Sequence, residues 1–414
     1  MQHRASILPL TVILLFVLPR VGFSKPQPAS PNLLSLRHNR DGVVAMAKGD
    51  YEKALEEFQM AIEANPINAE AYNNRGLTYL RMGRNDRARF SFEAALKVDK
   101  KYAPAHNHLA LIYQDAGEPL KAIQYFKKAI KYDKQFADAH YNLGRLYFTE
   151  QEPDKAITEL VKATEIDDKH YKAHGLLGYV YTSVGEYEKA NARLNLALEI
   201  EPDSADTHNN LGFLLYKMGR LDQAGPHLAQ AIRLNPKLVE AYMNLGRVFS
   251  DQGSLKDALT TYREIIRVNP YYELAHFSLA LTYQQLADRD RANGKPDRAK
   301  KNLTQAIAAY QKAIEIDPNY RDAFYNSGIC YEELGINKSA LDMYRRALEI
   351  DSQFVLAHYR VGTLSLNLGL TDAARLHLCA YNKLTRSRGD LVRERGIVDG
   401  FINDLGGCRG VSYP

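Results

Sequence analysis

The sequence predicts an all-α chain made of about ten tandem helix–turn–helix units. Three observations predict this fold class: a pattern that recurs every 34 residues from Ser35 onward, small residues at fixed places in each unit, and glycine or proline near the end of each expected helix. A fixed period of this length is typical of repeat proteins, in which each unit buries its apolar face against its neighbours. The ten units begin at Ser35, Ala69, Ala103, Ala137, Tyr171, Ala205, Val239, Glu273, Arg321 and Val355.

Small residues at two positions predict that the two helices of each unit lie close together. Position eight is glycine in eight units and alanine in the other two, and position twenty is alanine in every unit of ordinary length. Such side chains let helix axes approach to about 8–10 Å. Large residues are expected to fill the space beside them; in the second unit these are Tyr72, Arg75, Tyr79 and Phe92.

Glycine and proline mark the expected helix ends. Position fifteen is glycine in most units, for example Gly83 and Gly117, and glycine readily adopts the left-handed conformation that ends a helix. Proline near the end of several units, such as Pro66 and Pro202, has no N–H with which to continue the second helix.

This pattern resembles the tetratricopeptide repeat, whose 34-residue motif combines aromatic and glycine residues in a first helix with alanine, phenylalanine and proline in a second. The resemblance covers residues 35–388 and implies antiparallel helix pairs stacked into a right-handed superhelix, an α-solenoid, with a concave inner face. Residues 389–405 carry apolar residues at helical spacing, so we expect a capping helix there and a tail over residues 406–414.

The eighth unit, residues 273–320, has 14 residues more than the others. Its turn comes seven residues late and its ending seven residues later again, so each helix should gain seven residues, nearly two α-helical turns. The longer hairpin should project about 10 Å. It is interpreted either as a solvated extension with internal ion pairs or as a docking spur for an acidic partner, whose basic residues are Arg289, Arg291, Lys295 and Arg298.

The N-terminus has the pattern of an export signal. Arg4 is followed by an apolar stretch from Ile7 to Leu18 and then by small residues, so residues 1–24 are expected to be a signal peptide. We therefore expect an exported, periplasmic protein. The alternative is a retained anchor with the chain facing the periplasm, the one case in which we expect membrane contact. Residues 25–34 are rich in proline and predict an extended linker.

The chain contains three cysteines and no CxxC motif, so the sequence favours neither a cysteine metal site nor a redox site. In an oxidising compartment Cys379 and Cys408 could form a disulfide. The alternative is that all three thiols remain unpaired.

Composition and motifs argue against several functions. The net charge is +5, and the expected signal peptide accounts for two of these charges, which leaves too little positive charge to indicate nucleic-acid binding. No P-loop, GxSxG or HExxH motif is present, so we expect no enzyme, no cofactor and no small-molecule substrate. Seven of the twelve histidines occupy position four of their units. Successive ones should lie about 10 Å apart, too far to share a metal ion, so we predict no metal site.

One helical stripe is expected to face the concave side, because the resemblance places positions two, five, nine, twelve and thirteen there. Aromatic rings beside mixed charges suit an extended peptide or a helix of a partner protein. The predicted groove residues of this stripe are Tyr141, Arg145, Phe148, Tyr179, Phe213, Tyr216, Arg247, Phe277, Tyr325 and Tyr359.

Position six is asparagine in five units: Asn74, Asn142, Asn210, Asn244 and Asn326. A row of amides could bond to a peptide backbone, and the row resembles the asparagine ladder in the repeat domain of O-linked N-acetylglucosamine transferase. The alternative is a role in helix packing, since asparagine is common here in tetratricopeptide repeats.

The sequence therefore predicts a non-catalytic protein-interaction scaffold of the cell envelope. Its combination of an export signal with tandem repeats resembles that of tetratricopeptide proteins that help to assemble type IV pilus and secretion machines. The alternative is a recruitment subunit for an envelope glycosyltransferase or a cell-wall hydrolase.

Overall fold

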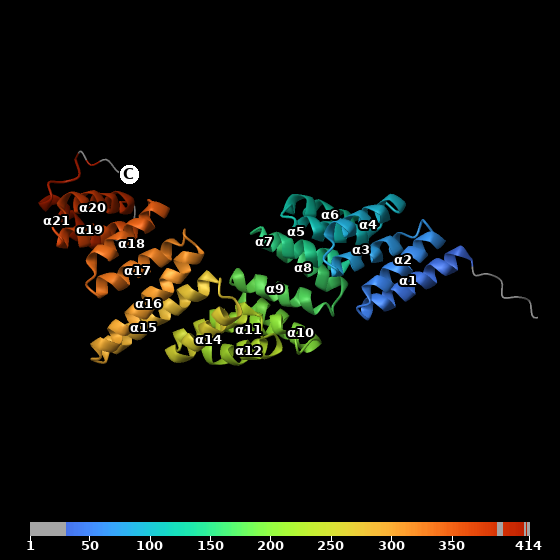
Figure 1. Cartoon of the computed structure of the whole chain (residues 1–414), viewed down its shortest axis with the longest axis horizontal. Helices are drawn as coiled ribbons and strands as arrows, with labels where there is room; N and C mark the ends of the chain where they lie inside the picture. The colour runs from blue at the N-terminus through green and yellow to red at the C-terminus, as the bar shows by residue number, and fades with distance from the viewer. Residues whose placement is uncertain (1–29, 387–391, 410, 412–414) are drawn as a thin grey trace, which may run out of the picture. The chain divides into compact units, whose positions relative to one another are not determined.

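The computed structural model of the chain describes residues 30–386, 392–409 and 411, so the expected signal peptide lies outside the described residues. These residues form 21 α-helices and no β-strand, which confirms the predicted all-α repeat fold (Figure 1). No described helix combines the length and the apolar character needed to span a bilayer.

The helices alternate between first and second helices of successive repeats. The first helices are α1 (Pro31–Ala47), α3 (Ala69–Arg81), α5 (Ala103–Asp115), α7 (Ala137–Thr149), α9 (Tyr171–Ser183), α11 (Ala205–Lys217), α13 (Val239–Asp251), α15 (Glu273–Ala292), α17 (Arg321–Glu333) and α19 (Val355–Asn367). The second helices are α2 (Tyr51–Ala64), α4 (Asn85–Val98), α6 (Pro119–Tyr132), α8 (Pro153–Ile166), α10 (Tyr187–Ile200), α12 (Leu221–Leu234), α14 (Leu255–Val268), α16 (Pro296–Ile316), α18 (Asn337–Ile350) and α20 (Thr371–Thr385), and α21 (Val392–Asp404) follows.

The chain divides into two compact units. Unit 1 is Met1–Ala139 and unit 2 is His140–Pro414, so the boundary falls within the first turn of α7. Helices α3 and α5 in unit 1, and each first helix from α9 onward in unit 2, pack against the second helix of their own repeat and against the second helix that precedes them.

In the repeats with glycine at position eight, this glycine lies directly against the large side chain at position twenty-four. A Cβ atom added to Gly246 would lie 2.5 Å from Cε1 of Tyr262, and one added to Gly212 would lie 2.5 Å from Cγ of Leu228. Equivalent pairs occur in the other glycine-containing repeats, and the large partner is almost fully buried each time. The helices can approach this closely only because the first helix carries no side chain at that point.

Turns between paired helices use a residue with positive φ. Gly117 has φ of 72°, which a residue without Cβ adopts at little cost. Gln151 occupies the same position in the fourth repeat with φ of 60°, the one described non-glycine residue with positive φ. The backbone N–H groups of Gln151 and Glu152 donate to the carbonyl oxygens of Phe148 and Tyr147 at 3.1 and 2.8 Å, so the turn is closed without glycine.

The first helix begins earlier than expected. An extended linker was predicted as far as residue 34, but α1 starts at Pro31. Proline is favoured in the first turn of a helix because its φ is already helical. The Ser30 side chain also accepts a hydrogen bond from the backbone N–H of Leu33 at 3.3 Å, so Ser30 caps the helix. The linker prediction is wrong for residues 31–34.

The eighth repeat is a longer hairpin. Helices α15 and α16 contain 20 and 21 residues, whereas α13 and α14 contain 13 and 14. The extra turns continue the apolar core, because Leu286 and Leu303 are both buried there. The hairpin therefore follows the packing of its neighbours and extends it (Figure 1).

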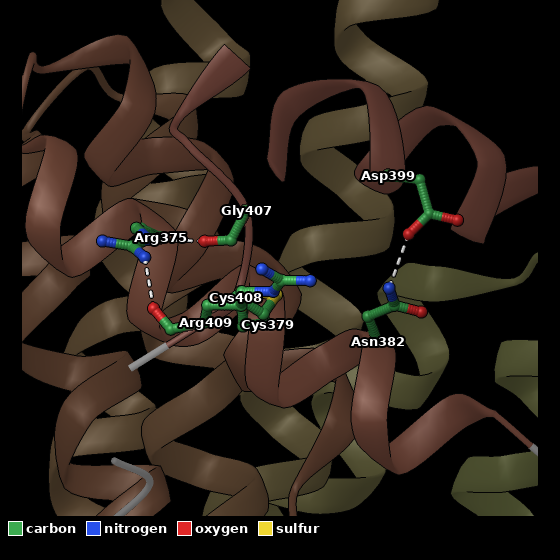
Figure 2. The surroundings of a disulfide bond; sticks show 7 residues. All are labelled: Arg375, Cys379, Asn382, Asp399, Gly407, Cys408 and Arg409. Atoms are coloured by element: carbon green, nitrogen blue, oxygen red, sulfur yellow. Dashed lines mark hydrogen bonds between the residues drawn. A yellow bond between two sulfur atoms is a disulfide. The ribbon is translucent and has the colours of Figure 1, made fainter. Parts of the chain in front are cut away.

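A disulfide joins Cys379 on α20 to Cys408, which follows α21 (Figure 2). Hydrogen bonds surround it: the guanidinium of Arg375 donates to the carbonyl oxygens of Gly407 and Arg409 at 2.6 and 2.7 Å. Val398 and Ile402 of α21 are buried against α20. The final helix is thus attached to the last repeat by apolar contacts, hydrogen bonds and a covalent bond, while Cys330 is a buried free thiol.

We expect Gly212→Ala to lower the free energy of unfolding by about 1–3 kcal/mol, because the new methyl group would overlap Leu228. Urea unfolding monitored by circular dichroism measures this change. Gly400→Ala is the control, because an added Cβ at Gly400 in α21 would meet no atom within 4 Å apart from its chain neighbours and the nearby backbone of its own helix. There the higher helix propensity of alanine should stabilise the helix by about 0.5–1 kcal/mol. Equal effects at both sites would contradict the close-approach explanation.

We expect reduction of the disulfide to loosen α21 and leave the repeats intact, because the bond closes the loop between Cys379 and Cys408. Loop closure of this length contributes about 3–4 kcal/mol. Hydrogen exchange measured by mass spectrometry should accelerate in residues 392–409 after reduction, with unchanged protection in α3–α16. Unchanged exchange in α21 would mean that packing alone holds this helix.

Candidate protein-binding groove

The first helices of unit 2 form a hollow that brings several predicted residues together. Its volume is about 560 Å³, and its walls come from α7, α9, α11, α13 and the start of α15. Six predicted groove residues line it: Tyr141, Tyr179, Asn210, Phe213, Asn244 and Arg247.

Two further hollows adjoin this one. A space of about 410 Å³ shares Tyr141, Asp206 and Asn210 with it, and another of about 250 Å³ shares Arg247 and Leu274 and adds Phe277. Because neighbouring hollows share lining residues, the three form one trough along α7 to α15. We call this trough the groove.

Aromatic rings form one wall of the groove. The rings of Tyr179 and Phe213 line the central hollow 5.7 Å apart, and the ring of Phe148, outside the hollow, packs edge-on against Tyr179 at 5.5 Å. These rings are half-buried, so each keeps part of its surface open to solvent. Rings fixed in this way offer contact area to a ligand with little loss of conformational entropy.

Charged groups of both signs lie beside the aromatic wall. Asp206 and Glu240 line the central hollow together with Arg247. Within the described part of the chain, the Arg247 guanidinium forms no ion pair or hydrogen bond. Burial raises the pKa of the neighbouring Tyr216 phenol, as does its hydrogen bond to Asp251, while the charge of Arg247 opposes the rise. Arg247 therefore presents an available cation in the middle of the groove.

Position-six asparagines bond to the preceding repeat. Nδ2 of Asn74 donates to Oδ1 of Asn39 at 3.0 Å, and Nδ2 of Asn244 donates to Oδ1 of Asn209 at 2.9 Å. All four side chains are buried. These amides join the first helices of successive repeats, which is the helix-packing role. Each amide has a second N–H, so peptide contact by Asn244 stays a prediction.

The other three asparagines differ from one another. Nδ2 of Asn210 donates to the carbonyl oxygen of Gly175 at 3.3 Å, and its side chain lines the groove. Nδ2 of Asn326 donates to the carbonyl oxygen of Asp322 in its own helix at 2.8 Å. Asn142 on α7 also interacts with the rest of the chain. The five amides thus do not form one uniform row.

Some predicted residues lie away from the three hollows. Tyr325 packs between Tyr344 and Phe354, and Tyr359 packs against Tyr381 at a ring distance of 5.4 Å. Both positions serve the core of the last repeats. Arg145 and Phe148 lie on α7, and Tyr216 belongs to the apolar cluster of α11 and α12. The groove formed by the three hollows is therefore shorter than the predicted stripe.

The predicted docking spur is partly engaged with its neighbours. Arg289 donates to the carbonyl oxygen of Gly253 at 3.3 Å, and Arg291 pairs with Asp288 and with Glu333 of α17. These contacts tie the extension to the repeats on both sides. Lys295 and Arg298 are exposed at the turn, so their docking role stays a prediction.

Position-four histidines close the turn that precedes their helix. Nε2 of five of them is hydrogen-bonded to the backbone carbonyl oxygen six residues earlier, at 3.0–3.1 Å: His106, His174, His208, His276 and His358. Among the described residues, no group of three or more metal-ligating side chains is placed to hold an ion. These contacts give the histidines a structural role.

Sequence reasoning missed several groove residues. Leu176, Met243, Tyr272 and Leu274 all line the central hollow. Tyr272 lies directly before α15, so a stripe defined by positions within the helices does not include it. Position five could have been recognised as the partner of position six, because it is asparagine in four repeats: Asn39, Asn73, Asn107 and Asn209.

The helix pairs, their 34-residue period and the groove on their first helices define a tetratricopeptide-repeat protein, a class that generally serves as a protein-interaction scaffold without catalysing a reaction. The family model described as "Cilia and flagella-associated protein 70 C-terminal domain" matches residues 29–277. Models described as "TPR repeat" and "Tetratricopeptide repeat" match residues 294–335 and 322–352. The chain therefore belongs to the family of the cilia and flagella-associated protein 70 C-terminal domain. The identification of its repeats as tetratricopeptide repeats is confirmed.

Several solved structures resemble the chain. A tetratricopeptide repeat protein from Parabacteroides merdae is 21% identical, with a TM-score of 0.47, over 60% of this chain and 98% of that one. YrrB, a tetratricopeptide protein described as having an unusual peptide-binding site, is 26% identical, with a TM-score of 0.36, over 49% and 96%. PilW, described as a type IV pilus biogenesis factor, is 20% identical, with a TM-score of 0.46, over 52% and 99%. No curated protein matches the chain.

We expect acid to destabilise unit 1 through His108. Nδ1 of His108 is 2.8 Å from Oδ1 of Asn73, and burial lowers the pKa of the imidazole to about 4, while the charge of Asp138 opposes the shift. The unfolded chain takes up this proton near pH ~6.5. Stability is therefore complete above that pH and is lost as the pH falls toward about 4.

The variant His108→Asn tests this expectation, because asparagine at position six makes the same contact elsewhere, as Asn244 does with Asn209. The acid-induced loss of unfolding free energy should shrink by up to about 3 kcal/mol. Urea midpoints measured near neutral pH and near pH ~4.5 give the difference. If the unfolding free energy of His108→Asn depends on pH as that of the wild type does, groups other than His108 cause the acid sensitivity.

Proposed function

We propose that the groove of unit 2 binds an extended segment of a partner protein and that the chain acts as a non-catalytic scaffold. One observation carries the proposal: a continuous trough in which half-buried aromatic rings, side-chain amides and the available Arg247 cation converge. An extended peptide presents what such a surface recognises, namely side chains that contact rings and backbone groups that bond to amides.

The groove chemistry indicates the kind of segment. Rings such as Tyr179 and Phe213 suit an apolar or aromatic anchor. Arg247 suits a carboxylate, because a guanidinium can donate two parallel hydrogen bonds to it. Asp206 and Glu240 suit a basic residue elsewhere in the segment. A partner segment with an apolar anchor and charges of both signs fits best.

The cellular location that we propose for this function is inferred from the sequence. The export-signal pattern of residues 1–24 supports a role in the cell envelope, either in the periplasm or at the membrane facing it. An assembly factor for a pilus or secretion machine fits an exported scaffold, and a recruitment subunit for a glycosyltransferase or cell-wall hydrolase is the alternative. Co-purified secretin or pilin segments would favour assembly, and a co-purified transferase or hydrolase would favour recruitment.

Crosslinking in cells tests the groove directly. A photoreactive amino acid in place of Phe213 lies in the central hollow, and one in place of the exposed Val268 at the end of α14 is the control. Adducts specific to position 213, identified by mass spectrometry, would name the partner. Identical adducts at both positions, or none at position 213, would overturn the groove assignment.

We expect Arg247→Ala to weaken peptide binding about tenfold or more, because a hydrogen-bonded carboxylate would lose its partner. Fluorescently labelled peptides selected from a random library on the wild-type chain are the probe, and fluorescence anisotropy gives their affinity. Arg233→Ala is the matched control, since Arg233 is exposed on α12 and bonds to Gln230. Equal affinity of the wild-type and Arg247→Ala chains would remove Arg247 from the binding site.

A further inference from the structure

Helix α6 of unit 1 has an exposed face whose charged residues are all basic. Its charged residues are all lysines, and no acidic residue lies between Pro119 and Tyr132. Residues at helical spacing place six exposed side chains on one face: Leu120, Lys121, Gln124, Lys127, Lys128 and Lys131. The second helix of the first repeat, α2, carries four glutamates and one lysine, so this charge is a local property of α6.

Aromatic rings lie beneath two of these lysines. Nζ of Lys128 is 4.5 Å from the ring centre of Tyr125, and Nζ of Lys131 is 5.9 Å from that of Tyr132. Neither ammonium forms an ion pair with any residue that the structure describes. By contrast, Lys121 is paired with Glu118 at the start of the helix. The positive charge at Lys128 and Lys131 is therefore not neutralised by an ion pair within the described residues.

The turn between α4 and α5 extends this surface. Lys100 and Lys101 are exposed there, and Lys134 is exposed in the turn after α6. His106 connects the segments, because its Nε2 is 3.0 Å from the carbonyl oxygen of Lys100 and its ring stacks on Tyr132 at 5.3 Å. The lysines of the turn and of α6 thus lie on adjoining parts of one surface. We define the lysine face as Lys100, Lys101, Lys127, Lys128, Lys131 and Lys134.

We propose that the lysine face binds the surface of an anionic lipid bilayer. Clusters of four to eight basic residues attract negatively charged headgroups, and each lysine near the surface contributes about fivefold to the affinity. Leu120 and Tyr132 are 76% and 39% exposed at the two ends of α6. Leucine and tyrosine side chains placed beside lysines can enter the headgroup region, which adds an apolar contribution.

The choice of lysine favours a lipid surface over a specific acidic site. From Phe90 to Gly144 the chain contains eight lysines and no arginine. Arginine provides the planar fork that recognises individual carboxylates and phosphates, whereas lysine is a strongly hydrated point charge on a flexible stem. A group of lysines therefore suits a diffuse negative surface, such as a bilayer with many anionic headgroups. This contact needs neither the groove nor residues 1–24.

The test compares binding of the full chain to vesicles of phosphatidylcholine with and without phosphatidylglycerol, measured by co-sedimentation. The variant Lys101→Gln/Lys128→Gln/Lys131→Gln/Lys134→Gln removes four charges. We expect the phosphatidylglycerol-dependent affinity to fall by about a hundredfold or more. The same part of the binding should weaken as salt is raised, because about 1 M salt shortens the screening length to about 3 Å.

A control variant removes the same charge from exposed positions in unit 2 and should bind as the wild type does. Its substitutions are Lys169→Gln/Lys237→Gln/Lys256→Gln/Lys338→Gln. All variants keep the apolar N-terminal stretch, so its contribution is the same in each, and circular dichroism checks folding. Equal loss in both variants, no loss in the first, or no dependence on phosphatidylglycerol would overturn the proposal. Tighter binding to polyglutamate or to single-stranded DNA than to vesicles would assign the face to an acidic protein or a nucleic acid.

Discussion

The fold depends on one contact repeated along the chain, in which a large side chain of the second helix rests on the bare backbone of the first. Gly212 beneath Leu228 and Gly246 beneath Tyr262 are examples, and an added Cβ would lie 2.5 Å from its neighbour at either place. Alanine takes the glycine position in two repeats, Ala110 and Ala280, and both residues are fully buried. The contact therefore sets a short interhelical distance without demanding glycine everywhere. Since each helix pair has nearly the same geometry, its first helices present the same face repeatedly, and in unit 2 this face forms the groove.

Most of the fold could be predicted from the sequence because local rules recur with the same period. The first helices α3, α5, α7 and their successors begin at the residues where the sequence pattern begins. One unit would have given little information, but agreement among many units identifies the fold. The predicted start of α1 is too late because the repeat pattern does not extend to Pro31. The proline and the Ser30 cap determine where this helix begins.

The candidate site was harder to predict because it depends on how successive repeats are placed. Three residues of the predicted stripe, Tyr179, Phe213 and Arg247, line one hollow. The stripe also included Tyr359, which packs against Tyr381 beside the apolar cluster that α20 forms with α21. The role of the asparagine row stayed open when position six was considered alone, since Asn244 pairs with Asn209, at position five of the preceding repeat. Contacts between repeats thus separate residues that look equivalent in the sequence.

The lengthened eighth repeat has a consequence for how such a chain can change in length. Its two helices gain the same number of residues, so the extra turns of α15 and α16 lie beside each other, and Leu286 and Leu303 are buried in one apolar cluster. An addition to only one helix would leave these apolar turns without a partner. The balanced addition of about seven residues to each helix keeps nearly the same rotation about each helix axis. A lengthened arm of this kind can accordingly be added to one repeat while the stacking of every other repeat stays as it was.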